Sequence, residues 1–359
     1  MRLRPVHARE LGFLQSQEDS MASIRSIVGP RVRATQYRRQ LAACAAAILF
    51  TVCGSPTTRA QPYPNRPIKL IVPTGPGVSP DVIARILAPK LAEAIGQPLV
   101  IENRPGAGSA VGAAAVANSP SDGYTLLFGI TATFTIAPFV IANPGYDPIS
   151  SFTPISLLAT SPFLLFVSSE VGVASVKALA DLAKSKPGQV SFAAANGSLP
   201  HLAGYLFMTA ANVQLTQVPY KTLTQAYPDL VAGRVQVMFE QLAPLRQHVR
   251  SGKVKALMVA SPNRHPQAPD VPTSAEAGLP GFEVISFFGL LGPKGMSSEI
   301  AKRLNSAVLT TLDAKEVRDA LYSQGIEASG SSSEQFSVFI DGEVRRWGPV
   351  VRASGAKLD

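Results

Sequence analysis

The chain has 359 residues, of which 46% are hydrophobic and 16% charged, so it is long enough for two globular domains with a large core. Its formal net charge of +9 is concentrated near the N-terminus, because residues 1–60 contain nine arginines, no lysine and three acidic residues. Residues 61–359 contain 24 basic and 21 acidic residues, and this near-neutral balance argues against a nucleic-acid-binding protein.

Residues 1–60 have the organisation of an export signal. Arg38 and Arg39 precede an apolar run over residues 41–53, which a small-x-small motif ending at Ala60 follows. This run of about 13 residues is too short to span a bilayer as a mature helix. We expect cleavage after Ala60 and a periplasmic mature chain. The arginine pair leaves Sec and twin-Arg export both open, and the true start is Met1 or Met21.

Short apolar runs alternate with helical patterns from residue 62 onward. The runs lie at 68–72, 98–102, 124–129, 190–194, 215–219, 235–239 and 254–260. Such alternation is typical of an α/β fold, in which ligands bind at the carboxyl ends of the strands.

Two long extended stretches, 154–167 and 283–292, flank the middle part of this pattern, and the C-terminal third is mostly helical. A chain that crosses into a second domain and then returns to the first would produce this order. We therefore predict two lobes separated by a cleft. The first lobe is discontinuous, 61–160 and 290–359, and the second is 161–289.

The stretch IVPTGPGVSPDVIARIL, residues 71–87, contains the end of a strand, a Pro/Gly loop and the start of a helix. Ser79 is expected to cap this helix, Pro80 suits its first turn, and Asp81 complements the positive end of the helix dipole. A strand, a glycine-rich loop and a helix N-terminus together favour binding of an anion by main-chain N–H groups.

The stretch AANGSLPHLAG, residues 194–204, repeats this arrangement in the second predicted lobe. A strand ends, Asn196, Gly197 and Ser198 form a turn, and a helix begins near Leu199. A capped helix start without any ligand accounts for one such loop equally well. Two such loops, one in each lobe, favour a ligand held between the lobes.

Several cofactor and catalytic motifs are missing from the mature sequence. The glycines of LVIENRPGAGSAVG (99–112) do not make a dinucleotide fingerprint, because three residues separate them from the strand and no acidic residue ends the next strand. Both cysteines, Cys44 and Cys53, lie in the leader, and the histidines of the mature chain are isolated. The sequence thus predicts no cofactor, no metal site and no disulfide. His201 near Ser198 is the one candidate pair for a hydrolase.

Six motifs resemble, in collinear order, the extracytoplasmic solute receptors of tripartite tricarboxylate transporters, the Bug receptors. They are YPNRPIKLIVP (63–73), GQPLVIENRPGAGS (96–109), SPSDGYTLLFG (119–129), VPYK (218–221), DVPTSAEAGLPGFE (270–283) and FFGLLGPKG (287–295). The resemblance implies a monomeric type II periplasmic binding protein that performs no chemistry. It would capture a small carboxylate and present it to membrane permease subunits. The alternative is a receptor that signals to a membrane sensor. A hydrolase on the same scaffold is a further alternative.

The resemblance also implies that main-chain amides and ordered water hold the ligand carboxylate. The candidate ligand-binding residues are Gly77, Val78, Ser79, Asp81, Thr131, Ala132, Thr133, Asn196, Gly197, Ser198, His201, Tyr220 and Glu240. Val78, Phe134 and Phe287 depart from the family pattern, and the two phenylalanines are expected to make the pocket wall more apolar. Because few charges lie nearby, mono- or dicarboxylates with an apolar body should bind better than citrate.

Overall fold

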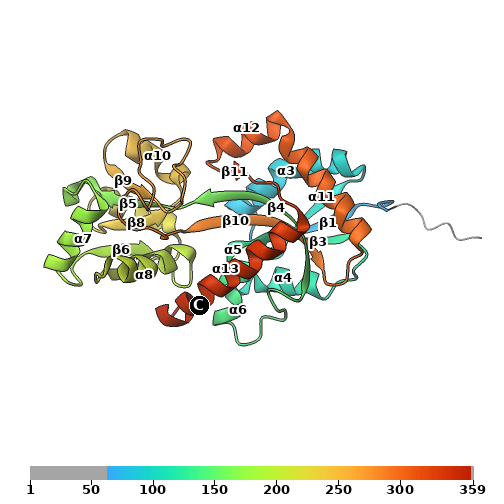
Figure 1. The fold of residues 1–359 in the computed structure, drawn as a ribbon, viewed down its shortest axis with the longest axis horizontal. Coiled ribbons are helices and arrows are strands. Elements are labelled where there is room, and N and C mark those ends of the chain that lie inside the picture. The colour runs from blue at the N-terminus through green and yellow to red at the C-terminus, as the bar shows by residue number, and fades with distance from the viewer. Residues whose placement is uncertain (1–62, 357–359) are drawn as a thin grey trace, which may run out of the picture. The chain divides into compact units, whose positions relative to one another are not determined.

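Two β-sheets form the framework of the computed structural model, which describes residues 63–356 (Figure 1). The first sheet has the strand order β11-β4-β10-β3-β1-β2 and the second the order β7-β6-β8-β5-β9. The strands of the first sheet are β1 (Ile68–Val72), β2 (Leu99–Asn103), β3 (Thr125–Ile130), β4 (Phe152–Pro162), β10 (Ile285–Pro293) and β11 (Glu327–Ala328). Those of the second sheet are β5 (Leu164–Ser168), β6 (Ser191–Ala194), β7 (Thr216–Pro219), β8 (Val237–Glu240) and β9 (Val254–Val259). All seven apolar runs singled out in the sequence are strands.

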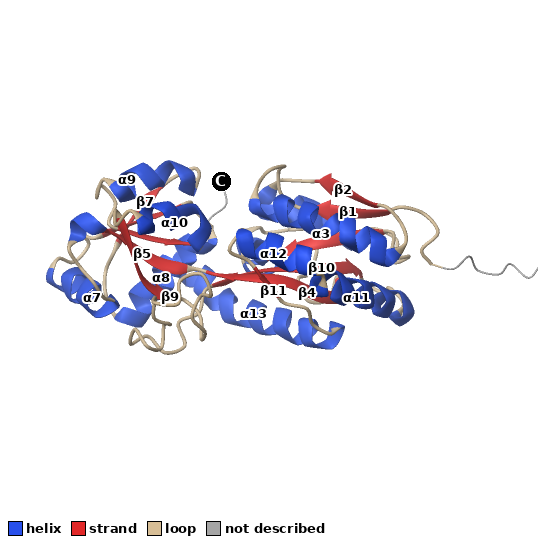
Figure 2. Ribbon diagram, turned by 90° about the horizontal axis from the view of Figure 1, so that it is seen from above, coloured by secondary structure: helices blue, strands red, loops and turns tan. Residues whose placement is uncertain are grey.

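Helices cover both faces of the first sheet, because its strands alternate their apolar side chains between two cores. In β1, Leu70 and Val72 face one core and Ile71 faces the other. The first core lies under α3 (Ser79–Ile95), α11 (Ser298–Asp313) and α12 (Lys315–Ser323). Figure 2 views the molecule from the side of these three helices. The second lies under α4 (Ala110–Ala117), α5 (Thr131–Thr135), α6 (Ala137–Val140) and α13 (Ser333–Ser354).

The second sheet is covered in the same way. One face carries α7 (Val176–Ser185) and α8 (Leu199–Ala211), and the other carries α9 (Tyr227–Val231) and α10 (Leu242–Arg250). Short 3-10 turns complete the described part, at Ala107–Ser109, Ser169–Val171 and Leu223–Ala226. Ser175 caps α7, accepting a hydrogen bond from the Ala178 N–H at 3.1 Å.

Two extended segments connect the sheets, as the long extended stretches in the sequence predict. β4 continues into β5 through Phe163, and the chain returns to β10 through Val284 (Figure 1). Main-chain hydrogen bonds hold the two segments together. The Phe163 N–H donates to Val284 O at 2.9 Å, and Ala260, which follows β9, donates to Phe163 O at 2.8 Å and accepts from the Val284 N–H at 2.9 Å. We propose that the lobes meet at Phe163 and Val284, two residues and five residues from the predicted boundaries.

Helix α13 packs against both sheets. Its N-terminal part packs on the first sheet through Phe336 and Ile340, and its C-terminal part buries Trp347 and Val351 in the core between the second sheet and α8. In residues 63–356, we find no helix with the length and apolar character that crossing a membrane requires. The predicted leader and its cleavage at Ala60 lie outside the described residues.

Candidate ligand-binding site

The loops predicted to bind the ligand follow strands that end at the junction of the two sheets. In the first sheet, β1, β2 and β3 are parallel, and the last residue of β3, Ile130, pairs with Phe288 near the start of β10. In the second sheet, β6, β7 and β8 are parallel, and Glu240 at the end of β8 pairs with Leu164 at the start of β5. Both sets of carboxyl ends therefore border the segments that connect the sheets, where α/β proteins bind ligands.

Asp81 organises the first of these loops. One of its carboxylate oxygens accepts hydrogen bonds from the Gly77 N–H at 2.8 Å and from Arg85 Nε at 2.9 Å, and the other accepts one from Asn103 Nδ2 at 2.9 Å. The side chain is 2% exposed. The Arg85 bond, with help from Gly77 and Asn103, overcomes the effect of burial and lowers the pKa of Asp81 to about 2. Asp81 thus serves the loop as a fixed anion.

The prediction that Ser79 caps α3 is wrong. Val78 is the N-cap residue and Ser79 is the first residue of the helix. Val78 has no side-chain oxygen, and the carboxylate of Asp81 instead accepts a bond from the N–H of Gly77 just before it. The start of α3 consequently has no side-chain cap. Pro80 has no N–H and the Asp81 N–H donates to Val78 O at 2.9 Å, so the Ser79 N–H is the group of the first turn that remains available for an anion.

A cavity of about 220 Å³ lies between this loop and the start of α10. Its lining residues are Gly77, Ser79, Val82, Ile83, Gln241, Ala243, Pro244, Gln324 and Ile326. Like α3, helix α10 begins without a side-chain cap, because the side chain of its N-cap residue Gln241 accepts no hydrogen bond from the first turn. Two helix N-termini, one from each lobe, therefore border one cavity. The sequence reasoning missed Gln241 and Ala243, although Gln-Leu-Ala-Pro directly after an apolar strand was a usable helix-start signal.

The loop at residues 196–198 leads into α8 as predicted, but its polar groups form hydrogen bonds with neighbouring residues of the second lobe. The Ser198 hydroxyl caps α8 by accepting from the His201 N–H at 3.4 Å and donates to Ala195 O at 2.7 Å. The Gly197 N–H donates to His201 Nδ1 at 3.3 Å, and Gln217 donates to Asn196 Oδ1 at 3.0 Å. Burial lowers the pKa of His201, in keeping with a neutral ring that accepts at Nδ1.

The hydroxyls after β3 serve the fold of the first lobe. Thr131 accepts from the Phe287 N–H at 2.8 Å, which joins α5 to β10. Thr133 is fully buried and lies 2.9 Å from the Ser109 hydroxyl, while Ala132 is half-buried. The expectation that Phe134 and Phe287 line the pocket is wrong. Both rings are completely buried, with centroids 6.0 Å apart, because they fill the core under α4 and α13.

Tyr220 and Glu240 lie at the ends of β7 and β8. The Tyr220 hydroxyl donates to Asp229 at 2.7 Å and points into the second lobe. Glu240 immediately precedes Gln241, so it is the predicted site residue of the second lobe that stands next to the cavity lining. No group of three or more potential metal ligands is present in residues 63–356.

A family model described as the tripartite tricarboxylate transporter family receptor matches residues 83–356. The chain belongs to this receptor family. Protein BugT of Bordetella pertussis is 37% identical over 301 residues, which cover 83% of this chain and 92% of BugT. The structure of the periplasmic binding protein BugD is 32% identical with a TM-score of 0.68, covering 82% of this chain and 99% of BugD.

A third relative carries a bound ligand. The R. palustris protein Rpa4515, solved with adipate, is 34% identical with a TM-score of 0.71, and the match covers 82% of this receptor and 100% of Rpa4515. The predicted family and the two-lobed α/β fold of a periplasmic binding protein are thereby confirmed.

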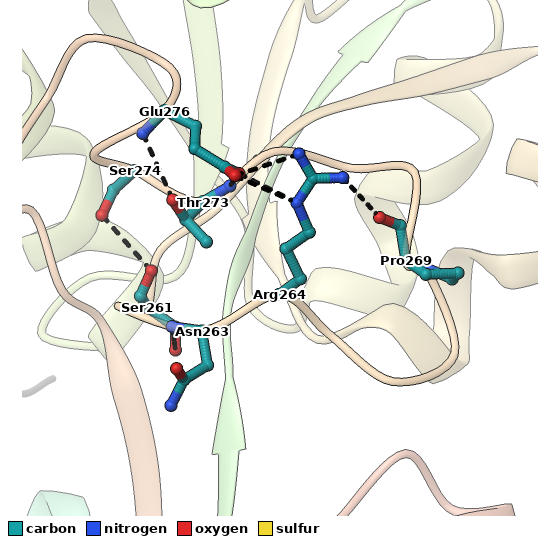
Figure 3. Close-up of polar contacts among 7 residues, drawn as sticks. All are labelled: Ser261, Asn263, Arg264, Pro269, Thr273, Ser274 and Glu276. Atoms are coloured by element: carbon teal, nitrogen blue, oxygen red, sulfur yellow. Dashed lines mark hydrogen bonds and ion pairs between the residues drawn. The ribbon is translucent and has the colours of Figure 1, made fainter.

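One motif shared with the family, DVPTSAEAGLPGFE, holds the return segment of the receptor in place (Figure 3). Glu276 accepts from the Thr273 N–H at 2.8 Å, and its own N–H donates to the Thr273 hydroxyl at 3.2 Å. The Arg264 guanidinium donates to both carboxylate oxygens of Glu276, at 2.9 and 3.0 Å, and to Pro269 O at 2.7 Å. The segment then buries Phe282 beneath the second sheet before the chain enters β10.

Proposed function

We propose that this receptor captures a small carboxylate between its two lobes and delivers it to the membrane permease subunits of a tripartite transporter. It works in the periplasm after removal of its leader, as a monomer, and it performs no chemistry. The family assignment supports the receptor role, and the adipate bound to Rpa4515 supports the ligand class.

The observation that carries the proposal is the cavity bordered by the starts of α3 and α10. Each start offers a main-chain N–H, that of Ser79 in α3 and that of Ala243 in α10, and the positive end of a helix dipole without a side-chain cap, which together attract a carboxylate. A ligand that contacts residues 77–79 and residues 241–244 at once would hold the lobes together. Closure of this kind excludes water and strengthens each hydrogen bond to the anion.

The cavity also supports a preference for small acids with an apolar body. Its volume of about 220 Å³ lies below the roughly 300–1,000 Å³ of sites for drug-sized ligands. Val82, Ile83, Pro244 and Ile326 give it apolar walls, and no charged side chain is among its lining residues in the described chain. The three carboxylates of citrate would lack cationic partners there, whereas an adipate-like acid brings only two carboxylates into the cavity.

The arrangement of Ser198 and His201 argues against the hydrolase alternative. A serine nucleophile needs a base that accepts its hydroxyl proton. Here the Ser198 hydroxyl donates to Ala195 O, and His201 Nδ1 accepts from the Gly197 N–H. Both side chains instead form hydrogen bonds at the start of α8.

The test is the affinity for adipate of the mature chain and of a Ser79→Pro variant, measured by calorimetry. Ser79 is the first residue of α3 and follows an extended residue, so proline fits there while removing the hydroxyl and the N–H of a cavity-lining residue. Losing a hydrogen bond to a charged group costs about 1.5–3 kcal/mol, so binding should weaken about ten- to a hundredfold.

Ser298→Pro is the matched control, because Ser298 is likewise the first residue of a helix, α11, and follows an extended cap residue. This variant should bind adipate like the unmodified receptor. Equal affinities for Ser79→Pro and Ser298→Pro would remove the start of α3 from the site. Failure of the unmodified receptor to bind adipate or any acid of a small mono- and dicarboxylate panel would contradict the proposed function itself.

A further inference from the structure

Glu240 is a buried carboxyl group at the cavity that makes no ion pair in the described chain. It is 8% exposed and ends β8 on the side of the sheet that α9 and α10 cover. One oxygen accepts from the Gln241 N–H at 2.8 Å and the other from the Tyr227 hydroxyl at 3.2 Å. The receptor thus carries an anionic group of its own beside the helix start that we assign to the ligand.

The surroundings of Glu240 set its protonation near neutral pH. Its partner on β5, Leu164, is apolar, and Tyr227 is the titratable group that contacts it from α9. From α10 it meets the Gln241 N–H at the helix start. Burial raises the pKa of Glu240 to about 7, and the bonds from Gln241 and Tyr227 only partly oppose this rise.

An ionised Glu240 and a ligand carboxylate would compete for the same helix end. Glu240 bonds to the N–H of Gln241, and Gln241 and Ala243 line the cavity from the first turn of α10. Two anions at one buried helix end repel each other, and this repulsion favours protonation of one of them, which removes its charge. A protonated Glu240 removes that repulsion and turns from an acceptor into a possible donor.

We infer that Glu240 couples capture to proton uptake, so that the receptor binds its carboxylate with one proton taken from solvent onto the Glu240 side chain. This inference rests on the proposed function, because it assigns a role to a residue of the same site. If the ligand binds only the protonated form, the apparent affinity follows the protonated fraction. With a pKa of about 7, that fraction falls about tenfold between pH 6 and pH 8.

The experiment measures adipate binding at pH 6 and pH 8 by calorimetry in buffers of different ionisation enthalpy. The unmodified receptor should bind about tenfold more weakly at pH 8 and should take up close to one proton per adipate there. Glu240→Gln keeps an acceptor and mimics the neutral form, so its affinity should be the same at both pH values. Glu343→Gln is the control, since Glu343 on α13 is another carboxyl whose pKa burial raises, yet it does not line the cavity. It should keep the tenfold dependence.

Three outcomes overturn the inference. Adipate binding that is independent of pH without proton uptake excludes the coupling while leaving the receptor function intact. A tenfold dependence that survives in Glu240→Gln assigns the proton to another group. Absence of adipate binding at both pH values in the unmodified receptor removes both the inference and its basis. Proton uptake is measured in the unmodified receptor, so its absence refutes the coupling even if the variant folds poorly.

Discussion

Replacing Asp81 by asparagine should lower the free energy of unfolding by about 2–3 kcal/mol at pH 7. The hydrogen bond from Arg85, with those from Gly77 and Asn103, holds the pKa of Asp81 at about 2, against an ordinary value of 3.8. One pKa unit corresponds to about 1.4 kcal/mol, so the ionised side chain stabilises the fold by about 2.5 kcal/mol. An asparagine also has one acceptor oxygen where three donors converge, which leaves at least one of these donors without its present partner.

The pH dependence of this effect has a definite sign. Above about pH 4, Asp81 is ionised in the folded and the unfolded protein, and its full contribution to stability is present. As the pH falls through about 2, the folded protein takes up the proton and the contribution disappears. The difference between the unmodified receptor and Asp81→Asn should therefore be largest between pH 5 and pH 8 and should shrink toward pH 2.

Urea denaturation followed by far-ultraviolet circular dichroism measures this difference, and the fluorescence of Trp347, the chain's one tryptophan, gives a second signal. Asp181→Asn is the control, because Asp181 pairs with Lys177 on the surface of α7 with both side chains more than half exposed. Such exposed pairs contribute little, so this variant should stay within about 0.5 kcal/mol of the unmodified receptor. A loss below about 0.5 kcal/mol for Asp81→Asn at pH 7 would refute the role given to its carboxylate.

Two further predictions follow from close packing and from the charge of the cavity. Gly112→Ala should cost about 1–3 kcal/mol in urea denaturation, because a Cβ there would lie 2.8 Å from the Pro73 side chain and 2.9 Å from Arg104 O. Gly342→Ala on α13 has open space around it and should instead stabilise the receptor by up to about 1 kcal/mol; a loss at this control would show that the comparison measures something other than crowding. In paired calorimetric titrations adipate should bind more tightly than citrate, and a tenfold preference for citrate would contradict the apolar, uncharged cavity described above.

The sequence alone determined the elements whose causes are local. The strands lie where apolar runs occur, Ser175 and Ser198 cap helices because their hydroxyls reach an N–H three residues on, and Gly96 ends α3 in a left-handed conformation. The family motifs were equally readable, since they are contiguous stretches of chain. The two long extended segments even indicated that the chain crosses between lobes and returns.

The tertiary structure alone decided which of these elements meet. Phe134 and Phe287 lie 153 positions apart in the chain, and only the pairing of β3 with β10 places both in one core rather than in the cavity. Likewise, the start of α10 at Gln241 faces the start of α3 because β8 ends at the junction of the two sheets. Hydrophobic periodicity records which face of an element is buried, but it contains no information about the distant segment that covers that face. The loops were therefore predictable, and the pair of loops that borders the cavity was not.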